Sequence, residues 1–137
     1  MIKQVTLRVH VHATESEEKV RKALAFVAGR SAVETTSAKG YYGNPIRVMV
    51  CTLKKRADIS AFFARLRENG VLQEVLLHLE ERVDEDGVLH MRFDKQEAYM
   101  GRLKLVSGGD VISVRCRAVC YPGTELLPAL REYLEGN

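Results

Sequence analysis

Two stretches in which apolar and polar residues strictly alternate constrain the fold of this chain more than any other feature. The first covers residues 3–13 and the second covers residues 111–121. A period of two is typical of a strand with one buried and one exposed face, because successive side chains point to opposite sides of a sheet. We therefore predict a sheet that buries one face and leaves the other open.

Helical patterns separate the predicted strands. Thr14 and Glu17 have the spacing of a capping box, which predicts a helix from there to about Gly29. Asp58 is the predicted N-cap of a second helical region, and a last helix is predicted at about 124–134. Further strands are predicted near residues 32–39, 46–53, 88–93 and 102–106. This order predicts an α+β fold: a single domain over residues 1–137, with a mostly antiparallel sheet of about five or six strands and helices packed on one face.

Length and composition exclude several classes of protein. The chain has 137 residues, which fits one domain, and 46% of them are hydrophobic, which is enough for a real core. No apolar run approaches the roughly 20 residues that cross a bilayer, and the first thirty residues lack an apolar signal core. The three cysteines are odd in number and form no CxxC, so we expect no disulfide framework and a cytoplasmic location.

The exposed positions of the predicted strands are rich in basic residues. Residues 1–56 alone hold 11 Lys and Arg against 4 Asp and Glu. The outward positions that we assign to this basic face are Arg8, His10, His12, Arg92, Arg115 and Arg117. Like charges side by side cost stability, and phosphate is the obvious compensating anion. The alternatives are a solvated face and a docking surface for an acidic protein. No aromatic residue occupies these positions, so stacking of RNA bases on the sheet is not expected.

The loop between the second and third predicted strands is a further candidate for RNA contact. It contains two glycines and a proline, which are typical of a hairpin turn. Its candidate contacts, with the flanking cations, are Lys39, Tyr41, Tyr42, Asn44 and Arg47. The tyrosines could stack on unpaired bases while the cations hold phosphates. Alternatively, the tyrosines fold back on the core.

Lys95 stands at an unusual place for a lysine. Asp94 is the predicted N-cap of a short helical turn, and Glu97 has the spacing to reach back to it. A cation in the first turn of a helix opposes the helix dipole. We therefore predict that Lys95 and Arg92 form a phosphate seat, with an ordinary exposed lysine as the alternative.

Evidence for metal or catalytic chemistry is weak. His10 and His12 share one face of a strand, and His90 could join them, but no cysteine or carboxylate has ligand spacing beside them. The chain has no Walker loop, GxSxG or HExxH motif. We expect no metal, no cofactor and no enzymatic activity.

Three segments together resemble a known family. They are Ala-Thr-Glu-Ser-Glu-Glu-Lys-Val at 13–20, Gly-Tyr-Tyr-Gly-Asn-Pro-Ile at 40–46, and residues 92–101 with the Asp-Val-Ile at 110–112. The chain resembles an archaeal family of RNA-binding proteins, or predicted exosome subunits, whose fold is related to the large-subunit ribosomal protein that holds 5S RNA. Histidine is common in that family where this chain has Tyr41, and alanine where it has Glu97. The resemblance implies an α+β domain with RNA as its partner.

We conclude that the sequence favours a non-catalytic protein that binds structured or single-stranded RNA, in association with RNA processing or the archaeal exosome. The alternative is a protein–protein adaptor that docks an acidic partner. The last predicted helix carries an apolar surplus that predicts a homodimer. Its apolar residues are Leu126, Leu127, Leu130, Tyr133 and Leu134. Alternatively, all five cover one edge of the sheet in a monomer.

Overall fold

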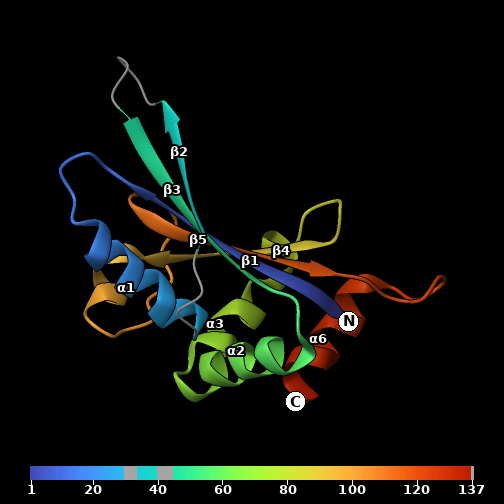
Figure 1. Cartoon of the computed structure of the whole chain (residues 1–137). Coiled ribbons are helices and arrows are strands. Elements are labelled where there is room, and N and C mark those ends of the chain that lie inside the picture. The colour runs from blue at the N-terminus through green and yellow to red at the C-terminus, as the bar shows by residue number, and fades with distance from the viewer. Residues whose placement is uncertain (30–33, 40–44, 137) are drawn as a thin grey trace. The chain divides into compact units, whose positions relative to one another are not determined.

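A computed structural model describes residues 1–29, 34–39 and 45–136 of the chain (Figure 1). Strands and helices are mixed along the sequence, which confirms the α+β class. In chain order the elements are β1 (Ile2–Val11), α1 (Glu17–Ala28), β2 (Glu34–Lys39), β3 (Pro45–Leu53), α2 (Arg56–Glu68), α3 (Val71–Leu77), α4 (Leu79–Arg82), β4 (Val88–Asp94), α5 (Lys95–Tyr99), β5 (Val111–Ala118) and α6 (Leu126–Gly136).

The strands form an open antiparallel sheet in the order β2-β3-β1-β5-β4. β2 and β3 pair antiparallel, with Glu34 opposite Val50 and Lys39 opposite Pro45. β3 lies inside the sheet, between β2 and β1.

The prediction of a strand at 102–106 is wrong. Leu105 makes only an isolated bridge to Phe93, flanked by two backbone hydrogen bonds to β4. The turn at residues 107–110 follows at once, and it leaves no room for a longer ladder.

The chain divides into two compact units. Unit 1 consists of Met1–Val5, Leu53–Met91 and Arg115–Asn137, and unit 2 consists of Thr6–Thr52 and Arg92–Val114. The organisation as a single domain over residues 1–137 stays a prediction. In the described parts of the chain, none of the helices has the length and apolar content that crossing a membrane requires.

In unit 2, the predicted alternation of β1 is confirmed. Leu7 and Val9 are completely buried, and Arg8 between them is exposed. The helix that follows begins later than the capping box predicted, because Ser16 is its N-cap and accepts a hydrogen bond from the amide of Lys19. The chain is still turning at Thr14, since the Glu15 amide donates to the carbonyl of His12.

The helices of unit 1 also begin and end near the predicted places. α2 begins at Arg56 with Lys55 as its N-cap, so Asp58 lies inside the first turn and the predicted cap is wrong. The amide of Ile59 already donates to the carbonyl of Lys55, which extends the helix backwards past Asp58. The last helix, predicted at 124–134, is α6 (Leu126–Gly136).

Candidate nucleic-acid interface

The exposed sides of β1 and β4 carry the basic residues of unit 2 that the sequence predicted. Arg8, His10 and Arg92 are exposed, while their neighbours Val9, Met91 and Phe93 are buried. Among the described residues, neither Arg8 nor Arg92 forms an ion pair within the reach of a salt bridge. Both guanidinium groups are therefore available to an anion from outside the protein.

The predicted outward residues of β5 are also exposed. Arg115 and Arg117 alternate with Cys116 and Ala118, which are buried. His90 of β4 differs from them, because its Nε2 lies 2.7 Å from Asp84 Oδ2. This hydrogen bond from His90 is the main cause of the lowered pKa of Asp84.

Lys95 is not the exposed phosphate seat that we predicted. Only 6% of the residue is exposed, and its ammonium lies 2.8 Å from Glu15 Oε1 and 2.8 Å from Asp110 Oδ2. Nζ also donates to the carbonyl of His10 at 2.9 Å. A buried ammonium is stable only when charges and acceptors surround it, and here the protein itself provides them. The alternative of an ordinary exposed lysine is wrong for the same reason.

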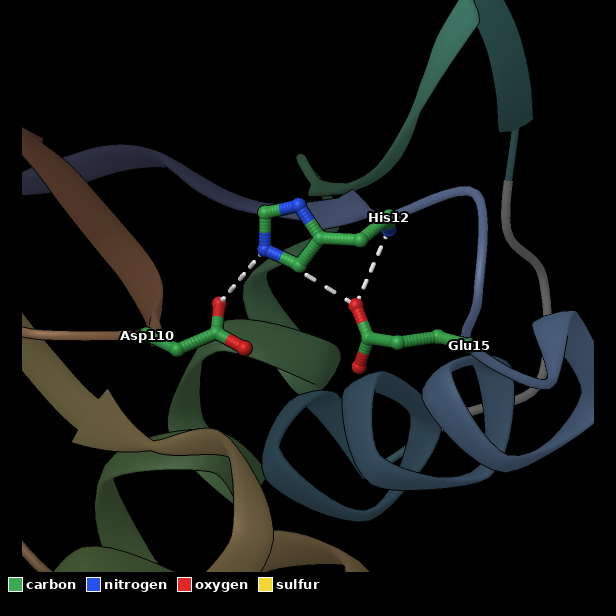
Figure 2. Close-up of side chains that lie close together, drawn as sticks. All are labelled: His12, Glu15 and Asp110. Atoms are coloured by element: carbon green, nitrogen blue, oxygen red, sulfur yellow. Dashed lines mark hydrogen bonds and ion pairs between the residues drawn. The ribbon is translucent and has the colours of Figure 1, made fainter.

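His12 lies beside the same two carboxylates, those of Glu15 and Asp110 (Figure 2). Its Nε2 lies 3.5 Å from Asp110 Oδ1 and 3.9 Å from Glu15 Oε1, and its backbone amide donates to Glu15 Oε1 at 2.9 Å. We call His12, Glu15, Lys95 and Asp110 the Lys95 cluster. It ties the end of β1 to the turn before β5, and it leaves His12 less free to meet phosphate than His10.

Within the described residues, three members of the Lys95 cluster lie close enough together to hold a metal ion. His12, Glu15 and Asp110 each offer one ligand atom, and these atoms lie within 4.8 Å of one another. However, the Lys95 ammonium contacts both carboxylates and would repel a divalent cation placed between them. We therefore interpret the cluster as an internal ion-pair network and assign no metal to it.

The caps and ion pairs around α5 match the prediction in part. Asp94 accepts a hydrogen bond from the Glu97 amide at 2.8 Å and is the N-cap, as predicted. Glu97 does not reach back to it, because its carboxylate pairs with Arg102 at 2.6 Å.

Three of the five predicted loop contacts lie outside the described residues. Tyr41, Tyr42 and Asn44 lie outside the described residues, and Lys39 is described only as the end of β2. Arg47 is exposed on β3, but its guanidinium forms an ion pair with Glu17 of α1. A phosphate at Arg47 would have to compete with that carboxylate.

A groove in unit 2 was not predicted from the sequence. It has a volume of about 220 Å³ and lies where α1 packs against α5. The ammonium groups of Lys19 and Lys22 lie 5.6 Å and 5.1 Å from the ring centre of Tyr99. Lys19 and Lys22 are three residues apart and thus share one face of α1, which is the sequence signal that could have pointed to this site.

Comparison with known proteins gives matches over nearly the whole chain. A family model described as RNA binding matches residues 4–118. RNA-binding protein PAB1135 of Pyrococcus abyssi is 37% identical, in an alignment that covers 97% of this chain and 94% of that protein. The uncharacterized protein MJ0213 of Methanocaldococcus jannaschii is 29% identical, in an alignment that covers 82% of this chain and 81% of that protein.

Solved structures show the same fold. Protein AF2318 of Archaeglobus fulgidus superposes with a TM-score of 0.85 at 39% identity, covering 96% of this chain and 99% of that one. Mth689 of Methanothermobacter thermautotrophicus superposes with a TM-score of 0.81 at 33% identity, covering 99% and 97%. Both are described as DUF54 proteins.

Proposed function

We propose, from the premise that this chain belongs to the RNA-binding family that matches residues 4–118, that it binds RNA through the basic side of its strands. The observation that carries this proposal is the contrast between two kinds of basic side chain. Lys95, Arg47 and His12 already have carboxylate partners, whereas Arg8 and Arg92 are exposed and have no ion pair among the described residues. Unpaired arginines on an open face suit phosphate oxygens, which they can bind in a bidentate way.

The mode of recognition that we propose is contact with phosphates and with the shape of the RNA. The exposed residues of β1, β4 and β5 are lysine, arginine and histidine, and none of them is aromatic. Stacking of bases on the sheet, as in ribonucleoprotein domains, is therefore not part of the proposal. Any stacking would come from Tyr41 and Tyr42 in the loop between β2 and β3. The protein would act as a binding module without catalysis.

Three further expectations stay predictions. They are association with an RNA-processing assembly such as the archaeal exosome, a cytoplasmic location, and a homodimer. The kinship of the fold with the ribosomal protein that holds 5S RNA also stays a prediction. For the homodimer, Leu130 and Leu134 of α6 are buried, and the remaining three apolar residues of that helix are half-buried. This leaves less apolar surface for a partner than the sequence indicated.

The test is an anisotropy titration of the protein with a labelled single-stranded RNA and a labelled RNA hairpin at several salt concentrations. If three to five cations meet phosphates, log affinity against log salt should have a slope of about −2 to −4, at ~0.7 per phosphate on single strands. Changing Arg8 and Arg92 to glutamine should reduce the magnitude of the slope by about 0.7 for each lost contact.

Arg102→Gln is the matched control, because Arg102 is an exposed cation of unit 2 that already pairs with Glu97. A slope that is unchanged in the double variant would remove β1 and β4 from the contact surface. No binding to either RNA at low salt would leave the adaptor, whose basic face docks an acidic protein, as the better interpretation.

A further inference from the structure

Unit 1 contains a pocket whose lining is basic and which the proposed RNA face does not include. Its volume is about 250 Å³, and it lies beside the start of β1, the start of α2 and the end of α6. Its lining residues are Met1, Ile2, Lys3, Lys54, Arg56, Ile59 and Tyr133. Three of the seven have cationic side chains and none is an acid. A pocket without a ligand seldom has such a composition, because no carboxylate compensates the positive charge.

The three cations are free to serve a ligand. Lys3, Lys54 and Arg56 are exposed, and the described residues form no salt bridge with any of them. They come from segments about fifty residues apart in the sequence, so only the folded chain concentrates them. Such a concentration of like charge costs stability unless an anion compensates it.

The other walls of the pocket are formed by buried apolar side chains and by the ring of Tyr133. Ile2 and Ile59 are 7% and 4% exposed, and the ring of Tyr133 stands edge-on to Phe63 at 6.2 Å. Burial is the main cause that raises the pKa of Tyr133, and the positive charges of Arg56 and Arg67 oppose this rise. At neutral pH the Tyr133 hydroxyl therefore carries its proton and can donate it in a hydrogen bond.

The start of α2 adds to the positive electrostatic potential of the pocket. This helix begins at Arg56, and its N-cap Lys55 makes no side-chain hydrogen bond to the helix amides. Two cations of the pocket lining, Lys54 and Arg56, thus stand at the positive end of a helix of 13 residues, where the dipole disfavours them. A bound anion would relieve this repulsion and accept from the open amides.

We propose that this pocket binds the terminal phosphate of an RNA strand. A terminal phosphomonoester carries a charge of about −1.5 to −2 at neutral pH, which suits three cations better than the single charge of a backbone phosphate. A pocket of about 250 Å³ suits the end of a strand better than its middle, because a backbone phosphate has a sugar on both sides and would need an open groove. This inference rests on the proposed function, because RNA supplies the phosphate.

The experiment compares four labelled forms of one single-stranded RNA: with a 5′-phosphate, with a 3′-phosphate, with both, and with hydroxyl groups at both ends. At least one terminal phosphate should tighten binding about tenfold, the size of one charge-assisted contact. The variants Lys54→Gln and Arg56→Gln should lose most of this preference while still binding the hydroxyl-ended RNA. Tyr133→Phe, which keeps the ring and its contact with Phe63, should lose part of it.

Lys55→Gln is the control, because it removes the same charge from the same exposed segment but does not line the pocket. Circular dichroism and thermal unfolding show whether each variant keeps its fold. An excess of a nucleoside monophosphate should abolish the preference, and its own binding would show that a free nucleotide can use the same pocket.

The outcomes separate the two proposals. Equal affinity for all four RNA forms would overturn the terminal-phosphate pocket and leave RNA binding intact. An equal loss of preference in Lys55→Gln would also overturn it, because a diffuse field would then explain the effect. Failure of all four forms to bind at low salt would overturn both proposals together.

Discussion

Replacement of Lys95 by methionine removes the ammonium group of the Lys95 cluster and keeps most of the volume of its side chain. In the native protein Nζ contacts the His10 carbonyl and the carboxylates of Glu15 and Asp110 at 2.8 to 3.0 Å. Each hydrogen bond to a charged group contributes ~1.5–3 kcal/mol, and burial of the ammonium costs several kcal/mol in the opposite direction.

The expected loss of stability in Lys95→Met depends on how exposed the carboxylates of Glu15 and Asp110 are. Removal of one partner from a fully buried ion pair costs roughly 3–5 kcal/mol. Here the side chains of Glu15 and Asp110 are 28% and 52% exposed, so water can solvate part of the charge that Lys95 leaves behind. We therefore expect Lys95→Met to lower the free energy of unfolding by about 2 kcal/mol. Urea unfolding followed by circular dichroism measures this value.

Two further variants make the test specific. Arg102→Met breaks an ion pair whose cation is 64% exposed, so it should cost less than about 1 kcal/mol. Asp110→Asn combined with Lys95→Met should cost less than the sum of the two single changes, because both remove the same contact. If Lys95→Met lowers the free energy of unfolding no more than Arg102→Met does, the interpretation of the Lys95 cluster as a buried network is wrong. If Lys95→Met weakens RNA binding tenfold and leaves stability unchanged, Lys95 binds phosphate after all, as the sequence predicted.

Three other predictions concern the loop, a surface ion pair and assembly. Changing Tyr41 or Tyr42 to alanine should weaken RNA binding by roughly 1–3 kcal/mol in anisotropy titrations if the ring stacks on a base; unchanged affinity with a lower melting temperature would instead indicate packing on the core. The His90 hydrogen bond lowers the pKa of Asp84, so its carboxylate contributes stability above its ordinary pKa of about 3.9, and this contribution disappears as the pH falls through the lower folded value. Asp84→Asn should thus lower the melting temperature near pH 7, and a difference that persists undiminished at the acid limit would contradict this assignment. Sedimentation at micromolar concentration should give twice the mass of 15.4 kDa if α6 mediates a homodimer, and 15.4 kDa throughout if the protein is a monomer.

Local patterns in the sequence determined which side of each strand is buried. The alternation in residues 3–13 and 111–121 predicted that Leu7 and Cys116 are inside and that Arg8 and Arg115 are outside, as the structure has them. The reason is that the direction of a side chain on a strand depends on the backbone of that strand alone. The N-cap at Asp94 was predicted for the same reason, because its hydrogen bond spans only three residues.

The tertiary structure alone decided which charges have partners. Lys95 was recognised in the sequence as a lysine at an unfavourable place, but its partner Glu15 is 80 positions away. From the sequence, a protein carboxylate and an external phosphate explain such a lysine equally well. The basic pocket of unit 1 likewise joins Lys3, Lys54 and Tyr133, which no spacing rule connects. Because the energy of a charge depends on its burial and on every charge within a few ångströms, only the folded chain determines which cations remain free for RNA.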